Sequence, residues 1–587
     1  MRIKPPYVLL DDARDGGATA RLYRDPRSVV TAHAPDEVAP LLEAVRAHAA
    51  EQGGEAAGFL SYEAAGAFEP AAAASRSADV PLGWFGLFDA YETVDVPALL
   101  PDPAGAWIGA LEPRLTRADY DAMFARVQAL IAAGDLYQAN LTFRADVAFH
   151  GDPLALYARL RGVTRGGWSA LVATGDATFL SFSPELFVAL EGDRLTCRPM
   201  KGTAPRLADA RADDAAAAAL LEDPKQRAEN LMIVDLMRND LSRVALAGSV
   251  AVPELFALER YPTVHQMTST VTATRAAGVD AVDVLAALFP CGSITGAPKV
   301  RAIQALDDIE ADARGLYCGA IGRIDASGDA MFNVAIRTLT LRKGAAHATI
   351  GLGGGVVADS TAAAEWDEAL AKGAFLSRGA RTFDLIETMA FDPMDGIALV
   401  ERHLSRMKDS AAALGFAFDR HDARNELQAA TFRLRAPSRV RMLLAKSGAV
   451  SIQVSPLPPL RDTPLLVAAV PLPVAPADWR LRHKTSDRGF YDAARRENGC
   501  EEVVFVAPDG SLTEGSYTSL FVERDGVLLT PPAGALLPGV LRAELLETGR
   551  AVEAALTLAD LADGFMMGNG LRGLMPARLI DADRAVA

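Results

Sequence analysis

The sequence predicts an α/β protein of the α+β type, divided into more than one domain. The chain has 587 residues, 50% of them hydrophobic, which is ample material for more than one buried core. Helical and strand-like patterns are mixed along it: residues 34–52 predict a helix, and residues 56–64 predict a strand. A loop rich in proline and glycine covers residues 96–107. Residues 115–147 then predict a capped helix that ends near Gly134 and is followed by a strand.

The composition argues against several classes of protein. The formal net charge of −16 and the pI near 5.1 argue against non-specific binding to nucleic acid or to a membrane surface. The first residues lack the apolar core of a signal peptide, and no apolar run of about 18 residues occurs. The cysteines are scattered without CxxC spacing, which argues against zinc or a disulfide framework: Cys197, Cys291, Cys318 and Cys500. We therefore expect a soluble cytoplasmic enzyme.

The stretch from Ser181 to Arg206 predicts a hairpin with chemically useful ends. Its two strands are joined by a turn at residues 191–193, so the two ends come together. Those ends carry Glu185, in Ser-Pro-Glu, and Lys201, in Pro-Met-Lys-Gly-Thr. A carboxyl that protonates a leaving group, beside an amine that attacks carbon, is typical of covalent catalysis. From this stretch alone, a surface salt bridge at the hairpin mouth is the favoured alternative.

Three glutamates in two distant segments indicate a cation site. Glu229 falls in the first turn of a helix predicted within residues 228–245, where a carboxylate also simply favours the helix dipole. Glu365 and Glu368 share one face of a helix predicted within residues 362–373. Mg2+ usually takes one or two carboxylates together with water and substrate oxygens. The glutamates therefore predict a magnesium site, with Glu229 and Glu368 as the first choices.

Two glycine-rich stretches look like nucleotide motifs but satisfy neither. In residues 289–299, FPCGSITGAPK, the lysine does not follow a glycine as it does in a phosphate loop. In residues 351–357, GLGGGVV, the final glycine of a dinucleotide motif is missing. As backbone nests, both stretches remain able to bind a carboxylate through converging N–H groups.

These motifs resemble those of the chorismate-utilising family, in particular component I of aminodeoxychorismate synthases. The most diagnostic match is FPCGSITGAPKVRAIQALDDIE, and LYCGAIGRI and NVAIRTL support it. The resemblance implies a chorismate-utilising enzyme fold, with a two-sheet core and flanking helices, over residues 1–378. Within it, residues 1–115 form the N-terminal part and residues 116–378 form the chorismate-binding part.

The resemblance also implies roles for individual residues. Lys201 is the nucleophile that distinguishes this branch, because the related anthranilate synthases typically have alanine there, and Glu185 is the general acid. His265 matches a family active-site histidine, although a lone histidine beside a strand is more often structural. The segments of Glu229, Glu365 and Glu368 match those that bind magnesium. The implied substrate site consists of Tyr317, Arg337, Gly354, Gly355, Thr295 and Lys372.

A second pattern begins near residue 379. FDLIETMAF and GIALVERHLSRMKDSAAALGF predict strand, turn, strand and helix, and alternating strands and turns follow. Residues 379–587 resemble aminodeoxychorismate lyase, of the fold-type IV pyridoxal phosphate family that includes branched-chain aminotransferases. The resemblance implies that Lys484 carries the cofactor and that Glu514 pairs with its ring nitrogen. The resemblance also implies that Arg406 and the backbone of Gly539 and Val540 bind the phosphate of the cofactor.

Two positions in this half depart from the family pattern. Gly570 stands where relatives often carry a small hydroxyl residue, which weakens a phosphate contact there. Thr388 is only a poor match to a proton-donating threonine. A lysine alone is usually a surface charge and a Thr-Glu pair is usually a turn, but Lys484 and Glu514 together in one half favour the lyase resemblance.

The implied activity has two steps in folate biosynthesis. The first half converts chorismate and ammonia to 4-amino-4-deoxychorismate with Mg2+. The second half uses pyridoxal 5'-phosphate to eliminate pyruvate and release 4-aminobenzoate. Because no cysteine lies in a glycine-flanked nucleophile motif, a separate glutamine amidotransferase subunit is the expected ammonia source. A homodimer through the C-terminal domain is expected by analogy.

Two alternatives remain open from the sequence. The first is an anthranilate or isochorismate synthase-type enzyme fused to an aminotransferase-like domain. The second is a C-terminal half that serves as a non-catalytic scaffold or docking module. Lys201 argues against the first, and the Lys484–Glu514 pair argues against the second.

Overall fold

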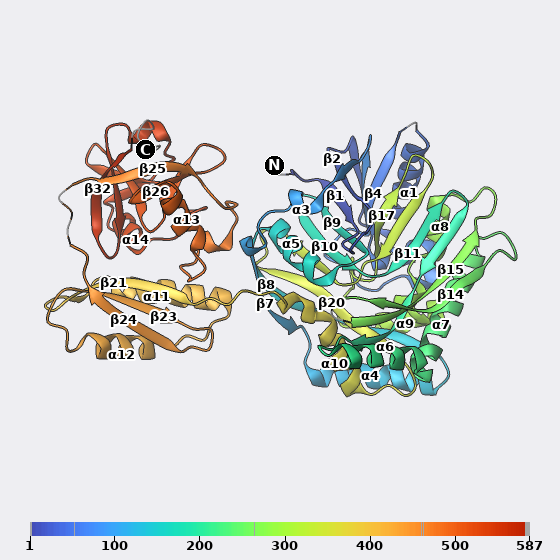
Figure 1. Ribbon diagram of the computed structural model, residues 1–587. Helices are drawn as coiled ribbons and strands as arrows, with labels where there is room; N and C mark the ends of the chain where they lie inside the picture. Colours follow the sequence, from blue (N-terminus) through green and yellow to red (C-terminus); the bar gives the residue numbers. More distant parts are fainter. Residues whose placement is uncertain (1–2, 52, 263, 460, 462, 581–587) are drawn as a thin grey trace. The chain divides into compact units, whose positions relative to one another are not determined.

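The computed structural model describes residues 3–51, 53–262, 264–459, 461 and 463–580 (Figure 1). The chain divides into two compact units. The first consists of the residues up to Leu100, Ala110–Val147 and Tyr157–Gly379, and the second of Pro101–Gly109, Ala148–Leu156 and the residues from Ala380 on. Within the described residues, no helix is long and apolar enough to cross a membrane.

Two ten-stranded sheets form the core of the first unit. One has the order β16-β8-β20-β19-β10-β9-β1-β2-β6, with β7 beside β8, and the other has the order β13-β15-β12-β11-β18-β17-β4-β5-β3, with β14 beside β15. The strands of the first sheet are β1 (Tyr7–Asp11), β2 (Ala20–Arg24), β6 (Glu92–Val94), β7 (Ala106–Pro113), β8 (Gln138–Gly151), β9 (Trp168–Ala173), β10 (Ala177–Ser183), β16 (Gly296–Ala297), β19 (Thr338–Arg342) and β20 (His347–Val356). Those of the second are β3 (Ser28–Ala32), β4 (Glu55–Leu60), β5 (Gly83–Phe88), β11 (Leu186–Glu191), β12 (Arg194–Arg198), β13 (Met200–Pro205), β14 (Ala251–Arg260), β15 (Val264–Thr274), β17 (Ala320–Ile324) and β18 (Ala330–Val334).

The two sheets pack face to face through aromatic and aliphatic side chains. Phe59 of β4 meets Phe179 of β10 with ring centroids 4.9 Å apart, and both rings are fully buried. Helices cover the far side of the second sheet, where α1, α7 and α8 share one apolar core with its strands (Figure 1). The helices are α1 (Pro35–Ala50), α2 (Ala65–Phe68), α3 (Val96–Leu99), α4 (Arg117–Ala132), α5 (Pro153–Thr164), α6 (Ala210–Glu222), α7 (Pro224–Ser242), α8 (Ala281–Leu288), α9 (Lys299–Ile309) and α10 (Ala362–Gly373). The expected two-sheet core with flanking helices is therefore confirmed.

The second unit contains two further sheets. A four-stranded sheet has the order β22-β21-β23-β24, and an eight-stranded sheet has the order β27-β26-β25-β32-β31-β28-β29-β30. The strands are β21 (Leu385–Asp392), β22 (Gly396–Ile397), β23 (Ser438–Leu444), β24 (Val450–Pro456), β25 (Leu465–Pro471), β26 (Glu502–Val506), β27 (Leu512–Gly515), β28 (Ser519–Arg524), β29 (Val527–Thr530), β30 (Ala551–Glu553), β31 (Phe565–Asn569) and β32 (Gly573–Leu579). The helices are α11 (Val400–Leu414), α12 (Arg420–Thr431), α13 (Gly489–Glu497) and α14 (Val540–Glu547).

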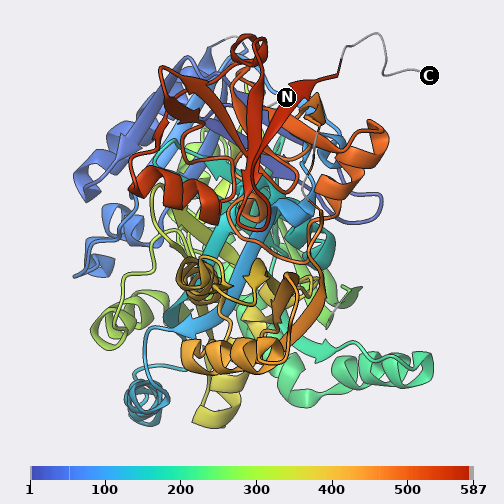
Figure 2. The ribbon, with the colours of Figure 1, turned by 90° about the vertical axis from the view of Figure 1, so that its left-hand side faces the viewer.

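Each sheet of the second unit has its own helices. Helices α11 and α12 form an apolar core with the four-stranded sheet. On β23, Val440 and Met442 are buried in that core, so the alternate residues Arg439 and Arg441 lie on the opposite face of the sheet. Helices α13 and α14 both pack on the face of the eight-stranded sheet opposite the apolar core that contains Val504 and Leu520, α13 against β25 and β26 and α14 against β28 and β29 (Figure 2).

The hairpin predicted from the sequence is present. Strands β11 and β12 pair antiparallel, and Gly192 in the turn has a φ of +59°, a left-handed conformation that glycine adopts without strain. Four predicted helices also match α1, α4, α10 and α11. The hydroxyl of Thr116 caps α4, and Gly134 follows its end with a φ of +82°.

Three expectations about local structure are wrong. Helix α7 begins at Pro224, capped by Asp223, so Glu229 lies in its second turn instead of its first. The glycines of GLGGGVV lie in β20, inside a sheet, so they do not form a backbone nest. In the part of the C-terminal half after the helix predicted within residues 396–416, only strands and turns were predicted, but α13 lies between Lys484 and Glu514.

A buried ion pair joins several segments of the first unit. Arg314 and Glu310 are 3% and 5% exposed, and the guanidinium donates to both oxygens of the carboxylate at 2.8 and 2.9 Å. The same guanidinium donates to the carbonyls of Ile294 and Asn140. Glu310 also accepts from the backbone and hydroxyl of Thr142. The pair thus fixes the segment after α9 to β8 and to the FPCGSITGAPK loop.

We predict that Arg314→Met destabilises the first unit by about 3 kcal/mol or more, because Glu310 would remain buried without its counter-charge. The measurement is the midpoint of the unfolding transition of that unit in denaturant. Arg301→Met is the control, since Arg301 pairs with Asp135 on the surface and its loss should cost at most about 1 kcal/mol. Equal midpoints for the two variants would contradict the prediction.

Candidate active sites

Glu185 occupies a dry position at the start of the hairpin. Its side chain lies immediately before β11, and the residue is 3% exposed. Burial raises the pKa of Glu185 to about 7, although hydrogen bonds from Ser293 and from the backbone of Met200 oppose the rise. One of its oxygens, Oε1, has no hydrogen-bond partner among the described residues. A carboxyl with such a pKa is protonated in a large fraction of molecules at neutral pH and is able to act as a general acid.

Lys201 lies at the other end of the hairpin, on β13. Its Nζ is 3.1 Å from Oε2 of Glu229, a residue of α7. Its backbone is held firmly, because the carbonyl of Lys201 accepts from Asn230 at 3.0 Å and the carbonyl of Gly202 accepts from Gln266 at 2.8 Å. Gly202 itself has a φ of +106°, which a residue with a side chain would adopt only under strain.

The bare backbone of β20 lies between Lys201 and α10. A Cβ added at Gly355 would lie 3.0 Å from Nζ of Lys201, and one added at Gly354 would lie 3.2 Å from Oε2 of Glu365. The same added atom at Gly354 would lie 3.3 Å from Nζ of Lys372. The structure therefore brings together, around β20, residues that the sequence assigned to catalysis, to metal binding and to substrate binding: Lys201, Glu229, Gly354, Gly355, Glu365, Glu368 and Lys372.

Aromatic packing fixes the orientation of α10. Trp366 stacks on Phe143 of β8, with ring centroids 5.0 Å apart, and meets Tyr120 of α4 at 5.1 Å. Because Trp366 points toward this core, its neighbours Glu365 and Glu368 are turned toward β20. Burial raises the pKa of Glu365, whereas the ammonium of Lys372, 2.9 Å away, lowers the pKa of Glu368.

The three glutamates fit a hard cation in ligand type. Among the described residues, no group of three or more acidic, histidine or cysteine side chains is arranged to hold a metal by itself. Glu229 and Glu368 instead pair with lysines, and Glu365 accepts from Ser360 at 2.7 Å. Mg2+ needs only one or two carboxylates when water and substrate supply the remaining oxygens. Glu365 and Glu368, both directed at Gly354, meet that requirement.

Four other predicted residues make no hydrogen bond or ion pair with this cluster among the described residues. His265 is fully buried, and its Nε2 lies 2.9 Å from Oδ1 of Asp213, while the hydroxyl of Thr295 donates to the carbonyl of Gly292. Among the residues that the structure describes, none of these four is hydrogen-bonded or paired with Lys201 or the three glutamates: His265, Thr295, Tyr317 and Arg337. Burial lowers the pKa of Arg337 because it removes water from the charged guanidinium. A bound anion would compensate for that loss of water, so this side chain is suited to bind one.

Two residues near Lys201 were missed in the sequence. Gln138, at the start of β8, is 1% exposed, and its Nε2 would lie 2.9 Å from a Cβ at Gly355. Asn230 is also 1% exposed and connects the carbonyl of Lys201 to the hydroxyl of Ser269. The signal for Asn230 was available, because it shares the apolar face of α7 with Ile233.

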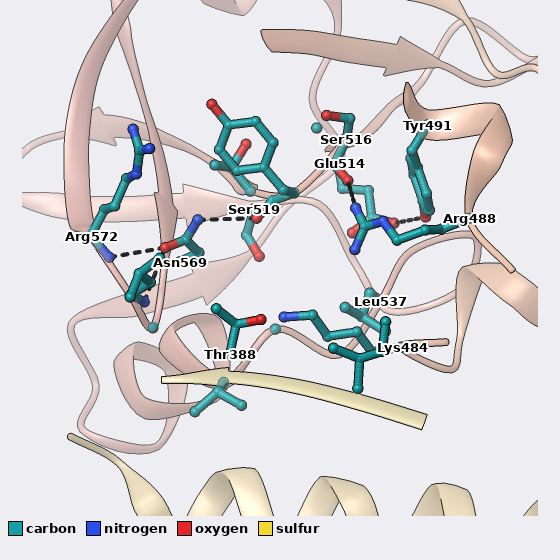
Figure 3. Close-up of a pocket in the computed structure, with 18 of the residues that line it drawn as sticks. Thr388, Lys484, Arg488, Tyr491, Glu514, Ser516, Ser519, Leu537, Asn569 and Arg572 are labelled. Atoms are coloured by element: carbon teal, nitrogen blue, oxygen red, sulfur yellow. Dashed lines mark hydrogen bonds between the residues drawn. The ribbon is translucent and has the colours of Figure 1, made fainter. Parts of the chain in front are cut away.

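The second unit contains a cavity of about 420 Å3. Residues of both its sheets contribute to the lining (Figure 3). The lining includes the cofactor residues predicted from the sequence and both departures from the family pattern: Thr388, Arg406, Lys484, Glu514, Gly539, Val540 and Gly570.

Lys484 reaches this cavity from the segment before α13. Its carbonyl accepts from the backbone of Ile386 at 2.8 Å, which fixes the segment to β21. Burial lowers the pKa of Lys484 to about 7, and the positive charge of Arg406 acts in the same direction. The amine points toward Thr388 (Figure 3). A lysine with this pKa is largely neutral in mildly alkaline solution and is able to condense with an aldehyde.

Glu514 lies at the end of β27 as a buried carboxyl. Burial raises its pKa to about 8, and its Oε1 accepts from the hydroxyl of Tyr491 at 2.7 Å. This carboxyl has no ion-pair partner among the described residues, so a protonated pyridine nitrogen would supply the missing positive charge. The cavity, the lysine and this carboxyl therefore fit pyridoxal phosphate.

Arg406 is held by a buried carboxylate that sequence reasoning missed. Glu387 of β21 is 1% exposed and accepts from Nε and Nη2 of Arg406 at 2.8 and 2.7 Å. Glu387 also pairs with Nδ1 of His403 at 2.5 Å. Although burial opposes it, the charge of Arg406 holds the pKa of Glu387 well below its usual range. A third donor of Arg406 bonds the carbonyl of Pro538, next to the start of α14.

Glu502 organises the loop beyond Glu514. It is fully buried and accepts from the hydroxyls of Ser516 and Thr518 at 2.6 and 2.9 Å and from the backbone of Ser516 at 2.9 Å. Nothing in the local sequence separates this residue from the neighbouring surface Glu501.

Two family models match the chain. One, described as chorismate binding enzyme, covers residues 5–378, and the other, described as amino-transferase class IV, covers residues 384–580. Component 1 of aminodeoxychorismate synthase from Salmonella typhimurium is 45% identical over 263 residues, which are 45% of this chain and 58% of that protein. The Escherichia coli protein of the same name is 44% identical over 261 residues (44% and 57%). Component 1 of anthranilate synthase from Haloferax volcanii is 39% identical over 270 residues (46% and 52%). This chain thus spans less than two thirds of these curated relatives.

Solved structures show the same fold. Component I of anthranilate synthase from Streptococcus pneumoniae superposes with a TM-score of 0.54 at 24% identity, over 64% of this chain and 93% of that chain. A 2,3-dihydroxybenzoate-specific isochorismate synthase from Bacillus anthracis superposes with a TM-score of 0.51 at 19% identity, over 64% and 95%.

We predict that Glu387→Gln destabilises the second unit by about 3 kcal/mol or more, because Arg406 would lose its buried counter-charge and His403 would lose its carboxylate acceptor. Since the pKa of Glu387 is depressed in the folded state, its contribution is present above its usual value of 4.5 and is lost as the pH falls. The measurement is the unfolding midpoint of this unit between neutral and acid pH. Glu544→Gln, which affects a partly exposed pair with Arg402, is the control. A midpoint shift no larger than that of the control would contradict the prediction.

Proposed function

Because this chain belongs to the chorismate binding enzyme family, we propose that it makes 4-aminobenzoate from chorismate in two steps. The first half, residues 1–378, converts chorismate and ammonia to 4-amino-4-deoxychorismate. The second half, residues 379–587, eliminates pyruvate from that product. Both steps belong to folate biosynthesis.

The observation that carries the first step is the position of Lys201 among the glutamates beside the bare strand β20. Chorismate has a ring diene conjugated to the carbon that bears its hydroxyl. Nζ of Lys201 attacks C2, the electrons shift along the diene, and the C4 hydroxyl leaves as water with a proton from Glu185. Ammonia then adds at C4, the electrons return along the diene, and the C2–N bond to Lys201 breaks. The ring is aminated, and the enzyme regains its amine.

The carboxylates and cations near Lys201 suit a dianionic substrate. Glu229, Glu365 and Glu368 would hold Mg2+, which would supply positive charge for the ring carboxylate of chorismate. Arg337, Tyr317, Thr295 and the backbone at Gly354 and Gly355 are assigned to substrate binding, with Lys372 beside them. His265 keeps its proposed place in the active site, oriented by Asp213.

In the second half, bound pyridoxal phosphate would supply an electron sink for elimination. Lys484 anchors the cofactor and moves the proton that the elimination requires. Glu514 faces the ring nitrogen, while Arg406 and the backbone of Gly539 and Val540 hold the phosphate. Arg439 and Arg441, on the cavity face of β23, give the site a positive charge that suits the carboxylates of the product of the first step.

The relatives support amination at C4 over the anthranilate alternative. The aminodeoxychorismate synthase components of Salmonella typhimurium and Escherichia coli are 45% and 44% identical to this chain, whereas that of Bacillus subtilis is 37% and the anthranilate synthase of Haloferax volcanii is 39% identical. Those relatives are named as component 1 of a synthase, which supports a partner subunit that supplies ammonia. The partner is a glutamine amidotransferase, the enzyme works in the cytoplasm, and the class IV half forms the contact of a homodimer.

The whole proposal is tested by incubating the protein with chorismate, ammonium, Mg2+ and pyridoxal phosphate and identifying the products. 4-Aminobenzoate and pyruvate in equal amounts are expected, and omission of Mg2+ in the presence of a chelator should stop chorismate consumption. Anthranilate or isochorismate as the product would reject the proposal.

We predict that Lys201→Ala loses amination at C4, because alanine cannot form the covalent bond to C2. Glu185→Gln should slow the same step by about 100-fold or more, since the proton donor is lost. Chorismate consumption and 4-amino-4-deoxychorismate are followed by chromatography with ammonium as the nitrogen source. Lys225→Ala, which removes a lysine near Glu229 but keeps the nucleophile, should retain amination. Normal amination by Lys201→Ala would exclude the covalent role.

We predict that Lys484→Ala separates the two steps. The variant should show no visible absorbance from attached cofactor and should release no 4-aminobenzoate, while it consumes chorismate and accumulates 4-amino-4-deoxychorismate. Lys408→Ala, on the exposed side of α11, is the matched control and should behave like the unaltered protein. Undiminished 4-aminobenzoate from Lys484→Ala would mean that the second half is not the lyase.

A further inference from the structure

His403 has one ring nitrogen that the fold leaves without a partner. The residue lines the cavity of the second unit and is only 1% exposed. Its Nδ1 lies 2.5 Å from Oε2 of Glu387, so this nitrogen carries the proton that the carboxylate accepts. Its Nε2 is buried and has no hydrogen-bond partner among the described residues. A buried polar atom without a partner is costly, which suggests that a ligand completes it.

The free nitrogen faces Gly570. A Cβ added at Gly570 would lie 3.1 Å from Nε2 of His403 and 3.9 Å from Cβ of Val540, the first residue of α14. Arg406 lies one turn further along α11 and shares Glu387 with His403. Because position 570 has no side chain, it supplies no side-chain donor of its own. His403, Arg406 and the N-terminus of α14 thus border the same end of the cavity.

We propose that Nε2 of His403 donates a hydrogen bond to the phosphate group of the cofactor, in the space left by Gly570. This inference rests on the proposed function, since it assumes that pyridoxal phosphate binds here with its phosphate at Arg406. Three features of the chain converge on it: the unpaired nitrogen, the missing side chain opposite, and the helix N-terminus, whose dipole favours an anion.

The proposed bond requires the ring to take up a proton. With Nδ1–H given to Glu387, a neutral imidazole has only a lone pair at Nε2, so a donor at Nε2 means an imidazolium. The groups that face the ring are Glu387 of β21, Arg406 of α11 and Lys484 of the segment before α13. The residues that face it from α14 and from the segment after β31, Val540 and Gly570, carry no charge.

These groups keep the ring neutral until an anion arrives. Burial lowers the pKa of His403, Glu387 opposes this, and Arg406 and Lys484 lower the pKa further. A phosphate dianion beside Nε2 would raise the pKa again, so binding takes one proton from solution. The contribution of His403 to affinity is then present at pH values below its pKa in the complex and is lost as the pH rises through that value. Below about pH 6 the phosphate itself loses charge, so affinity is greatest near neutrality.

The test uses pyridoxamine 5'-phosphate and pyridoxamine as probes of the full-length protein, because neither condenses with Lys484. Calorimetry in two buffers of different ionisation enthalpy gives both the affinity and the number of protons taken up. The unaltered protein should take up one more proton with the phosphorylated probe than His403→Asn does. His403→Asn should also lower the preference for the phosphorylated probe by about tenfold or more.

Two further variants keep the proposal falsifiable if His403→Asn folds poorly. Gly570→Ala places a methyl group near Nε2 and should weaken the phosphorylated probe while leaving pyridoxamine unaffected. His421→Asn, on the exposed face of α12, is the control and should change neither probe. Equal proton uptake in the unaltered protein and in His403→Asn, or an unchanged phosphate preference in both His403→Asn and Gly570→Ala, would overturn the inference. If the unaltered protein binds neither probe, the proposed cofactor, and with it the proposed function of the second half, fails instead.

Discussion

Loss of water around a few ionisable side chains sets the chemistry of both units. Burial is the largest cause of the pKa shift at Glu185, at Lys484 and at Glu514, and in each case it moves the pKa toward neutrality. A water-exposed carboxyl or amine would be almost wholly ionised at pH 7. By excluding solvent, the sheets and helices thus give these three groups the pKa values that their proposed roles require.

Other buried charges in the chain are arranged in the opposite way. Glu387 and Glu310 are as deeply buried as Glu185, but arginines neutralise them. Glu502 is instead surrounded by hydroxyl and backbone donors. These groups hold segments in place, and their protons are not needed for a reaction. The distinction between a structural and a reactive buried carboxyl in this protein is thus whether a cation or a full set of donors accompanies it.

Much of the fold and part of the sites could be predicted from the sequence, because the signals are local. The hairpin around Gly192 and the face shared by Glu365 and Glu368 follow from spacing and turn chemistry alone. The start of α7 was misplaced although Asp223 and Pro224 form a strong helix start, because the apolar residues that indicate a helix begin only at Leu231. Helix α13 lacks a side-chain cap at its start, which left little signal.

The residues that were missed depend on tertiary contacts. Glu387 acquires its role only when β21 packs beside α11, and Gln138 only when β8 pairs with β20, the strand of Gly355. Neither contact leaves a mark within a window of a few residues. His403 could be placed on the same helical face as Arg406 from their spacing, but nothing in the sequence indicates that one of its nitrogens would lack a partner.

The glycines of β20 have a consequence for how this active site is able to vary. At Gly354 and Gly355 even a single methyl group would come within about van der Waals contact or closer of Glu365 and of Lys201. Surface substitutions in most proteins are nearly neutral, and core positions often accept a residue of similar size. Here the essential property is an absence of atoms, for which no other amino acid is a substitute. We therefore expect a side chain at Gly354 or Gly355 to displace Glu365 or Lys201, although neither glycine carries a functional group of its own.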